Sequence, residues 1–384
     1  MTKALHLFSD PKFADIHIDR FNDPSFENRF ICLMADFQYE GSNLPLLEWV
    51  VPFSSAYDAL QQNSSSFDLV FVYNLDYIKS CFINGLPKEV LVVWHLYGTE
   101  IYNNYEPFRF SIYSDLTRNI LHLNRLFRLK SRVKRVLSRG KYFLLNKKAT
   151  YDEIHLAILR VNFLAWYSKI EYDYIQSRLP FKLPAFLPLS VLVKEPADLL
   201  SSRNRTNSIW LGNSASPENN HLDILTLFFK MAFKDPIIVP FSYGGPELYT
   251  RFLKDFKKRT GLNIALLENF VHYNRFTDLI GNCRTAVFNS YRQMALGTIF
   301  ISIKYGLKVY LNELNPSFAW LKSNGFHLYS IQQDFEADLF NNHLSLPPEY
   351  AAQNLEAYDK LISPFNNQLF LKQVTRLVND WKNR

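Results

Sequence analysis

The stretch TAVFNSYRQMALGTIFISIKYGLKVYL, residues 285–311, decides the fold class, because it reads as strand, turn, helix, turn and strand. Thr285–Phe288 and Lys308–Leu311 are short runs rich in β-forming residues. Between them, Ser290 and Gln293 have the spacing of a capping box, which predicts a helix from Ser290 to about residue 305. Repeated strand–helix units of this kind are typical of an open parallel α/β sheet.

The first turn of that predicted helix is a candidate binding site. In such sheets, ligands bind beyond the carboxyl ends of the strands, where helix N-termini present free N–H groups. Arg292 and Gln293 fall in this turn, and arginine offers phosphate a two-pronged clamp, so we expect a diphosphate here. Gly297 lies inside the same helix, where glycine costs about 1 kcal/mol relative to alanine. Either close helix–sheet packing or the approach of a ligand to the backbone would require it.

The composition fits a globular protein of two domains. The chain has 384 residues, of which 48% are hydrophobic, 21% charged and 16% aromatic. Three cysteines lie far apart in the sequence, which implies no disulfide framework and fits a reducing cytoplasm. The start MTKALHLFSD reads as a strand rather than a signal peptide, and no run of 18 apolar residues predicts a membrane-spanning helix.

Strand-like runs alternate with amphipathic stretches through the N-terminal half and predict a first βαβ sheet. The predicted strands are Ala4–Phe8, Phe30–Met34, Trp49–Val51, Leu69–Tyr73 and Glu89–Trp94, with helices around Ile16–Phe21, Tyr57–Gln61 and Tyr77–Phe82. The last of these strands leads into the loop His95–Tyr102. Because α/β domains place their chemistry in such loops, His95 and Glu100 are candidate catalytic residues.

A strongly basic segment follows. Residues 116–151 contain eleven lysines and arginines and no acid, although the net charge of the chain is only +7. A helix is predicted over Asn119–Ser138, with an apolar stripe beside a cationic one. The cationic stripe consists of Arg125, Arg128, Arg132, Arg135 and Arg139. Anionic membrane surfaces attract such a helix by about 1 kcal/mol per basic residue. The alternative is a core-packed helix whose arginines are merely solvated.

A second series of strand–helix units begins after a proline-containing stretch at 183–207, which we interpret as an interdomain linker. Its strands are predicted to begin near Ser208, Pro236, Asn263, Thr285, Lys308 and His327, with helices at His221–Ala232, Pro246–Phe256 and Phe276–Asn282. The predicted organisation is an N-terminal Rossmann-like domain with the basic helix (1–190), a linker (191–207) and a C-terminal Rossmann-like domain (208–365). The last helix (366–384) is free to pack across the join. Two doubly wound domains facing across a cleft describe the GT-B glycosyltransferase fold.

Other strand-end loops of the C-terminal half are candidate donor-binding sites. Gly212 permits a sharp turn, and Asn213 and Ser214 after it would offer hydrogen bonds to nucleotide or sugar hydroxyls. Tyr243 follows the next strand, where it can stack on a ligand or donate a hydrogen bond to it. Both loop sequences are also common in ordinary turns. Asn312 ends a later strand, at a position that often meets the nucleotide in GT-B C-terminal domains.

Several motifs together carry a family resemblance. They are Trp94-His95-x-x-Gly98-x-Glu100-x-Tyr102, Leu211-Gly212-Asn213-Ser214 with Asn219 and His221, Val239-Pro240-x-x-Tyr243, Arg292-Gln293 with Gly297, Gly306, and Asn312-x-x-Asn315-Pro316. With these motifs the chain resembles the TDP-N-acetylfucosamine:lipid II N-acetylfucosaminyltransferases (glycosyltransferase family 56). The match covers the C-terminal half almost continuously and the N-terminal half in patches that include Arg20-Phe21. Glu100 stands where the family usually has aspartate, and the family's paired histidines near the N-terminus are not reproduced in residues 9–21.

The resemblance implies transfer of an N-acetylated 4-amino-4,6-dideoxyhexose from a dTDP-sugar to an undecaprenyl-diphosphate-linked glycan. The product would be a surface polysaccharide such as enterobacterial common antigen or an O-antigen. The protein would sit peripherally on the cytoplasmic face of the bacterial inner membrane, in contact with its anionic surface through the basic helix. No Asp-x-Asp motif is placed at a strand end, so we expect no metal or other cofactor, with arginine and helix dipoles neutralising the diphosphate.

For the acceptor hydroxyl, His95 is the first candidate for a general base and Glu100 the second. His95 fits equally well as a structural histidine at a strand end. His221 is more typical of a contact to the donor sugar or of a helix start. A reaction that retains the anomeric configuration would need no base in this role, and the sequence leaves the stereochemical outcome open.

Two other functions are compatible with parts of the pattern. A GT-B-like pyruvyl or other group transferase would act on the same lipid-linked glycans with a different donor. A non-catalytic nucleic-acid-binding protein would dock the arginine-rich helix on phosphates. Against the second, the chain outside residues 116–151 has 32 basic and 36 acidic residues, and no nucleic-acid-binding module is visible.

Overall fold

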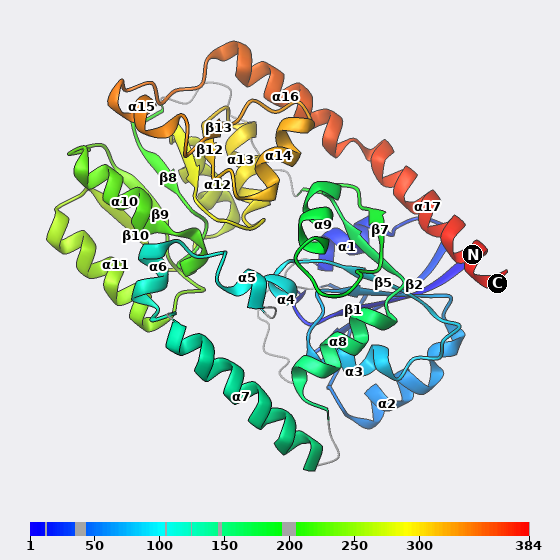
Figure 1. Cartoon of the computed structure of the whole chain (residues 1–384). Helices are drawn as coiled ribbons and strands as arrows, with labels where there is room; N and C mark the ends of the chain where they lie inside the picture. The colour runs from blue at the N-terminus through cyan, green and yellow to red at the C-terminus, as the bar shows by residue number, and fades with distance from the viewer. Residues whose placement is uncertain are drawn as a thin grey trace. The chain divides into compact units, whose positions relative to one another are not determined.

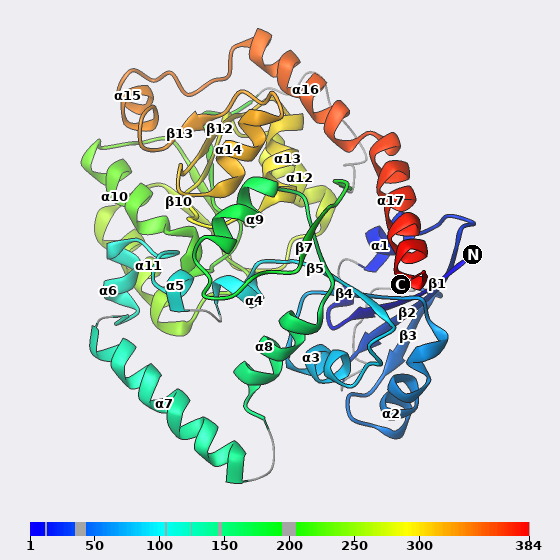
Figure 2. The same cartoon turned by 45° about the vertical axis from the view of Figure 1, so that its right-hand side comes forward.

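The computed structural model describes residues 1–11, 14–34, 44–103, 106–123, 125–144, 148–193 and 205–383. The chain forms two compact units, each built on one parallel sheet (Figure 1), and Figure 2 shows the same elements turned by 45°. The first unit comprises Met1–Asn104, Arg132–Val193 and Ile362–Arg384, and the second comprises Tyr105–Ser131 and Lys194–Leu361. The parallel α/β character predicted from the sequence is therefore confirmed.

The first sheet has seven strands in the order β3-β2-β1-β4-β5-β6-β7, all paired in parallel. They are β1 (Thr2–Phe8), β2 (Phe26–Leu33), β3 (Leu47–Val50), β4 (Leu69–Tyr73), β5 (Leu91–His95), β6 (Phe163–Trp166) and β7 (Ala185–Pro188). Every residue of β4 and β5 is buried, as expected for central parallel strands covered on both faces. The first five strands were predicted. β7 lies in the stretch interpreted as a linker, where its edge position tolerates Pro188.

The helices of the first unit are α1 (Ala14–Arg20), α2 (Ser55–Gln62), α3 (Tyr77–Asn84), α4 (Thr99–Tyr102), α8 (Thr150–Arg160), α9 (Lys169–Gln176) and α17 (Pro364–Lys382). Two of the helices that follow strands begin at clear side-chain caps. Ser54 accepts a hydrogen bond from the N–H of Tyr57 at the start of α2, and Asp76 accepts one from Lys79 at the start of α3. Such caps satisfy backbone donors that the first helical turn leaves unpaired.

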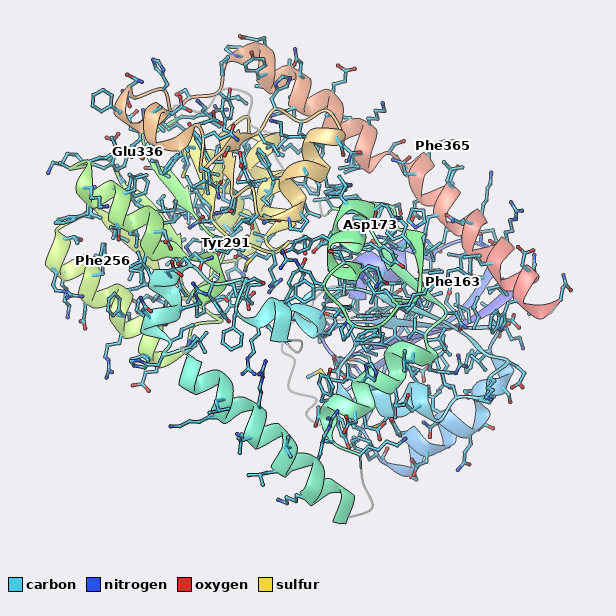
Figure 3. All side chains as sticks on the ribbon, in the orientation of Figure 1. Phe163, Asp173, Phe256, Tyr291, Glu336 and Phe365 are labelled. Carbon is cyan, nitrogen blue, oxygen red and sulfur yellow. The ribbon has the colours of Figure 1, made fainter. Side chains whose placement is uncertain are left out.

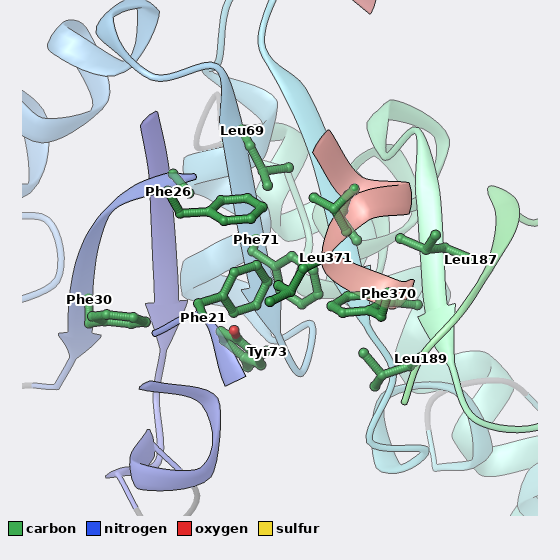
Figure 4. Close-up of a cluster of buried hydrophobic side chains, with 14 of the residues drawn as sticks. Phe21, Phe26, Phe30, Leu69, Phe71, Tyr73, Leu187, Leu189, Phe370 and Leu371 are labelled. Carbon is green, nitrogen blue, oxygen red and sulfur yellow. The ribbon is translucent and has the colours of Figure 1, made fainter. Parts of the chain in front are cut away.

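The last helix completes the core of the first unit (Figure 4). Phe370 and Leu371 of α17 are buried together with Phe21 and Phe71, beside Tyr73 at the end of β4. Val374 and Val378, at helical spacing from them, extend the same buried face. The predicted final helix therefore exists, and it forms part of the first unit.

The second sheet has six parallel strands in the order β10-β9-β8-β11-β12-β13. They are β8 (Ile209–Leu211), β9 (Ile237–Pro240), β10 (Ile264–Leu267), β11 (Thr285–Phe288), β12 (Lys308–Leu311) and β13 (Tyr329–Ser330), close to the six predicted positions. The helices are α5 (Glu106–Arg109), α6 (Asp115–Ile120), α10 (His221–Lys230), α11 (Glu247–Thr260), α12 (Tyr273–Gly281), α13 (Leu296–Lys304), α14 (Pro316–Ser323), α15 (Phe335–Phe340) and α16 (Pro348–Ile362), with a 3₁₀ turn at Pro217–Asn219. Residues 194–204, most of the predicted linker, lie outside the described residues.

One segment of the N-terminal half belongs to the second unit, which corrects the predicted domain 1–190. Ile120 and Leu121 pack against the hydrophobic core of the second unit. Asn220 accepts a hydrogen bond from the N–H of Ser114 (2.8 Å) and donates one to the carbonyl of Ile112 (3.2 Å). These contacts fix α6 and the residues before it to the second sheet.

The basic helix α7 spans Arg125–Leu144, so it begins and ends later than the predicted Asn119–Ser138. Residues 115–120 form the separate helix α6, which Ser114 caps. None of the helices in the described residues is long and apolar enough to cross a membrane.

Candidate active site

The order of strands in the second sheet reverses between β8 and β11. In open α/β sheets, the loops that follow the strands on the two sides of such a reversal form the ligand site. After β8 comes the turn Gly212–Ser214, and after β11 comes the loop Asn289–Ala295, which carries Tyr291 (Figure 3). We call these two stretches the reversal loops. The sequence singled out both of them independently.

Gly212 is held in a conformation that only glycine fits. Its φ is +72°, and a Cβ at this position would lie 2.8 Å from Nε2 of His221 and 2.9 Å from Oδ1 of Asn219. That oxygen accepts a hydrogen bond from the N–H of Asn213 (3.2 Å), while Nδ2 of Asn219 donates to the carbonyls of Ser214 and Ser216 (3.1 Å each). The Asn219 amide therefore shapes the turn, a role that the sequence pattern alone did not reveal.

The two polar side chains of this turn have different roles. Ser214 is buried, and its Oγ accepts hydrogen bonds from Asn219 and from the N–H of Ser216, so this side chain stabilises the loop, whereas it was expected to offer hydrogen bonds to a ligand. Asn213 differs, because its Oδ1 is buried without a hydrogen-bond partner among the described residues. Since a buried amide oxygen normally has a partner, Asn213 is the better candidate for a ligand contact.

A network of asparagines joins the two reversal loops. Asn220 donates to the carbonyl of Asn289, and Asn289 donates back to the carbonyl of Asn220, each at 3.1 Å. Nδ2 of Asn312, just past β12, donates to Oδ1 of Asn289 (2.7 Å), and all three residues are buried. Asn312 was predicted as a nucleotide contact, whereas here its amide braces the loop after β11. Single asparagines carry little sequence signal, which explains why Asn220 and Asn289 were missed.

The predicted helix start at Ser290 is wrong. Helix α13 begins at Leu296 after Ala295 in a left-handed conformation (φ 64°), and residues 289–295 form a loop. Oγ of Ser290 accepts a hydrogen bond from Nδ2 of Asn315 (3.0 Å), so this serine caps no helix. The hydroxyl found a partner 25 residues away that local spacing does not reveal.

Arg292 consequently lies in a loop and not in a first helical turn. Its Nε donates to the carboxylate of Glu218, and its Nη1 donates to the carbonyl of Gln293 (2.8 Å). Both charged side chains are only 7% exposed. Glu218 therefore balances much of the charge that Arg292 would bring to a phosphate group.

The structure also resolves the two explanations for Gly297. This glycine is exposed in the first turn of α13, and no described atom lies within 4 Å of a Cβ built on it. Close helix–sheet packing is therefore wrong as the reason for glycine, and the open backbone leaves room for a ligand.

Tyr243 is 55% exposed in the loop after β9, a position compatible with stacking on a ligand.

His221 lies beneath the Gly212 turn at the start of α10 and is fully buried. Its Nδ1 is 3.3 Å from the hydroxyl of Tyr249, and its Nε2 has no hydrogen-bond partner among the described residues. Burial lowers the pKa of His221 to about 3, so the ring is neutral at physiological pH.

The first sheet has its own strand-order reversal, between β1 and β4. His95 is the last residue of β5, next to β4, and its side chain is 2% exposed. Neither ring nitrogen has a hydrogen-bond partner among the described residues, which argues against a purely structural histidine. Burial, and then the charge of Arg20, hold the pKa of His95 well below its usual value. His95 is therefore a neutral imidazole able to accept a proton.

Glu100, the second candidate base, is used to build the loop. It is buried, and its Oε1 accepts hydrogen bonds from Nε1 of Trp94 (3.0 Å) and from the N–H of Tyr97 (2.9 Å). Burial raises the pKa of Glu100, against the effect of these donors. The carboxylate positions the residues that follow His95, so the geometry favours His95 over Glu100 as the base.

Helix α7 exposes its apolar stripe. Leu129 is 60% exposed and Val136 67%, and Val133 and Leu137 are also exposed. This exposure contradicts the core-packed alternative for the helix. Arg132 is exposed, while Arg139 is held by Asp152 (Nε–Oδ1 3.0 Å) and is the least suited to a membrane contact. The side chains of Arg125, Arg128 and Arg135 lie outside the described residues.

In the part of the chain that the structure describes, no group of three or more His, Cys, Asp or Glu residues could hold a metal ion.

Comparison with known proteins gives one family match and confirms the fold. A family model described as 4-alpha-L-fucosyltransferase glycosyl transferase group 56 matches residues 160–373. Similar solved structures include sucrose-phosphate synthase from Thermosynechococcus elongatus (TM-score 0.65, 9% identity, 99% of this chain and 100% of that one). HepE from Anabaena in complex with UDP has a TM-score of 0.60 and 10% identity, with 99% of this chain and 100% of that chain covered. The lipopolysaccharide outer core galactosyltransferase WaaB has a TM-score of 0.59 and 10% identity, with 98% of this chain and 99% of that chain covered. The predicted GT-B fold is thus confirmed. The comparison with curated proteins returned no match.

Proposed function

This chain belongs to the glycosyl transferase group 56 family, as the resemblance predicted, and from this premise we propose that it transfers an N-acetylated 4-amino-4,6-dideoxyhexose from a dTDP-sugar to an undecaprenyl-diphosphate-linked glycan. The protein is a glycosyltransferase. The family description names fucose, itself a 6-deoxyhexose, which supports a deoxy sugar as the donor. A nucleoside diphosphate is supported by HepE, which was solved with UDP.

The observation that carries the donor assignment is the pair of reversal loops in the second sheet. The loop after β8 carries a buried amide oxygen on Asn213 that has no hydrogen-bond partner among the described residues, and the loop after β11 leads into the open backbone of Gly297 at the start of α13. The N–H groups at a helix start favour an anion, and the amide oxygen would accept a hydrogen bond from a sugar or ribose hydroxyl. With Arg292 beside them, these groups would hold the diphosphate without a metal ion.

The proposed reaction joins the acceptor hydroxyl oxygen to the anomeric carbon of the donor sugar. The bond from that carbon to the β-phosphate oxygen breaks, and dTDP leaves with the electron pair. The hydroxyl proton passes to a base, for which His95 is suited because its ring is neutral and neither nitrogen has a hydrogen-bond partner among the described residues. Glu100 would keep the loop after His95 in place.

A thermal-shift screen of nucleotides tests the donor assignment. We expect dTDP to stabilise the protein by about 2.7 kcal/mol at a hundred times its Kd, and UDP at the same concentration to stabilise it less. Phosphoenolpyruvate serves as the comparison ligand, because a pyruvyl transferase would bind it instead. Stabilisation by phosphoenolpyruvate without any effect of dTDP would replace the proposed donor with the alternative one.

The acceptor is lipid-linked in this proposal, and α7 would bring the enzyme to the membrane surface. Exposed apolar side chains beside cationic ones suit the interface of an anionic bilayer. We propose that the protein binds peripherally there, on the cytoplasmic face of the inner membrane.

Charge reversal on α7 tests this membrane contact. We expect R128E/R132E/R135E to weaken binding to phosphatidylglycerol-containing vesicles by about two orders of magnitude, since each basic residue contributes about 1 kcal/mol. Vesicle sedimentation measures the change. A matched control reverses the three basic residues in the last turn of α11, Lys257, Lys258 and Arg259, and should leave binding unchanged. Equal retention of both variants on vesicles would argue that α7 is only a solvated helix.

A further inference from the structure

Arg20, the last residue of α1, is a buried cation without a carboxylate partner among the described residues. Its side chain is 1% exposed. Nη1 donates to Oγ of Ser190 (2.5 Å) and weakly to Oδ1 of Asn367 (3.5 Å), both neutral groups. Nε and Nη2 have no hydrogen-bond partner in the part of the chain that the structure describes. An ionised group buried without a counter-charge is costly, so this arrangement calls for an explanation.

The two unpartnered nitrogens form one edge of the guanidinium. The same chain shows what such an edge binds, because Nε of Arg29 donates to Oε1 of Glu48 (2.9 Å) and Nη2 donates to Oε2 (2.8 Å). This two-pronged geometry matches the spacing of two oxygens on a carboxylate or a phosphate group. On Arg29 the edge is occupied by a carboxylate, whereas on Arg20 it is buried and has no hydrogen-bond partner among the described residues.

Two histidines with unused nitrogens lie beside Arg20. His17 is on the same face of α1, three residues earlier, and its ring centroid is 5.0 Å from that of His95. Nε2 of His17 is 3.2 Å from the hydroxyl of Tyr97, but Nδ1 has no partner in the described part of the chain, and His95 has none at either nitrogen. Burial lowers the pKa of both histidines well below the usual value. Neutral imidazoles can donate one hydrogen bond each to an anion without adding a further buried charge.

Among the described residues, the remaining neighbours of Arg20 supply no negative charge. The groups that act on the charge of Arg20 are the side chains of Tyr73, Tyr97 and Tyr167, which are neutral near pH 7. Their pKa values are raised, chiefly by burial, so they stay protonated. Tyr97 and Tyr167 are partly exposed and stand edge-on to the ring of His95, so a ligand would enter past these two rings.

The position in the fold agrees with a ligand site. His17 follows β1, Tyr73 ends β4 and His95 ends β5, so the cluster lies at the carboxyl edge of the first sheet, where the strand order reverses. Ligands bind at this place in open α/β sheets. The sequence-based reading missed it because the partners of Arg20 are about 170 and 350 residues away in the chain.

We propose that Arg20, His17 and His95 bind an oxyanion of the acceptor, with two of its oxygens held by Nε and Nη2 of Arg20. The oxyanion is either a sugar carboxylate or a phosphate group, which share this recognition chemistry. The identification of the ligand as the acceptor rests on the proposed function, whereas the oxyanion site itself rests only on the geometry of the first unit. A sugar hydroxyl of an acceptor anchored in this way would lie close to the unused nitrogens of His95.

Binding of simple anions to the full chain tests the proposal. Calorimetric titrations would use sodium glucuronate, inorganic phosphate and uncharged glucose, and would be run on the wild type, R20Q, R20K and R29Q. We expect one anion to bind and glucose not to bind. R20Q should bind the anion at least tenfold more weakly than the wild type. R20K should have an intermediate affinity, because lysine keeps the positive charge but cannot form the two-pronged contact. R29Q should bind with the affinity of the wild type. Preference for glucuronate identifies a sugar carboxylate, and preference for phosphate identifies a phosphate group.

A second readout needs no variant. The ring nitrogen resonances of His17 and His95 in the ¹⁵N-histidine-labelled wild type should shift when the binding anion is added, while those of the buried His221 should not. Absence of anion binding to the wild type, or equal binding by R20Q and the wild type, would overturn the proposal. Stabilisation by dTDP, measured on the same samples, reports on the donor site in the second unit. Stabilisation by dTDP without anion binding would overturn only the anion site, whereas anion binding without stabilisation by dTDP would count against the proposed function.

Discussion

Replacing Arg292 with alanine is expected to weaken dTDP binding by about 10- to 100-fold. A hydrogen bond to a charged group contributes about 1.5–3 kcal/mol, and Arg292 is the cation of the reversal loops. The charge of Arg292 is shared, however, because its Nε donates to the buried carboxylate of Glu218. Glu218 competes with a phosphate group for the same guanidinium. Isothermal titration with dTDP measures the loss.

The same competition predicts that a change at Glu218 has the opposite effect on dTDP affinity. E218Q keeps the size of the side chain and an acceptor oxygen but removes the negative charge, so dTDP should bind more tightly to E218Q than to the wild type. R292A alone leaves a buried carboxylate unpaired, which costs about 3–5 kcal/mol of folding stability. The double variant E218Q/R292Q removes both charges and avoids that penalty. Unchanged dTDP affinity in this folded double variant would refute the diphosphate assignment.

The sequence was sufficient for the six strands of the second sheet and for five of the seven strands of the first, because central parallel strands are short, buried apolar runs between turn residues. Every residue of β8, β11 and β12 is buried, and each of these strands lies at its predicted place. The same pattern located Asn213 and His95, since loops at the carboxyl ends of strands are where α/β domains bind ligands. The predicted helix start at Ser290 was wrong because it was based on local spacing alone. Spacing along the chain does not show that the hydroxyl bonds to Asn315.

The parts that could not be predicted depend on contacts between distant residues. The segment of Ser114 is fixed to the second unit by Asn220, 106 residues away. Arg20 owes its buried, unpaired state to elements at both ends of the chain, since Asn367 of α17 completes its surroundings. A buried arginine on a short amphipathic helix has the same local pattern as a solvated one. Only the assembled fold shows that its charge has no partner among the described residues.

Replacing His95 with alanine is expected to lower kcat by about 100- to 10,000-fold, the range typical of a lost general base, while dTDP affinity changes little. The two effects separate because His95 belongs to the first unit and the reversal loops belong to the second. His221→Asn is the matched control, because His221 is also buried and its Nε2 also has no hydrogen-bond partner in the described part of the chain, yet it lies beneath the Gly212 turn. That variant should change dTDP affinity more than kcat. Near-normal turnover of H95A would remove His95 from the chemistry.

The pH dependence of kcat/KM adds a test of the same base. A base acts in its deprotonated form, so activity falls as the pH decreases through its pKa. Burial and the charge of Arg20 hold the pKa of His95 well below the usual value of 6.5. The fall of kcat/KM on the acid side of the pH profile, its acid limb, should therefore occur at a lower pH than for an ordinary histidine. His17 faces the same ring, and its pKa is also held well below the usual value, chiefly by burial and further by His95, Arg20 and His6, so it adds no charge in this range. In R20Q, loss of the nearby cation should move the acid limb to higher pH, toward 6.5. An acid limb that is identical in the wild type and in R20Q would show that another group carries the proton.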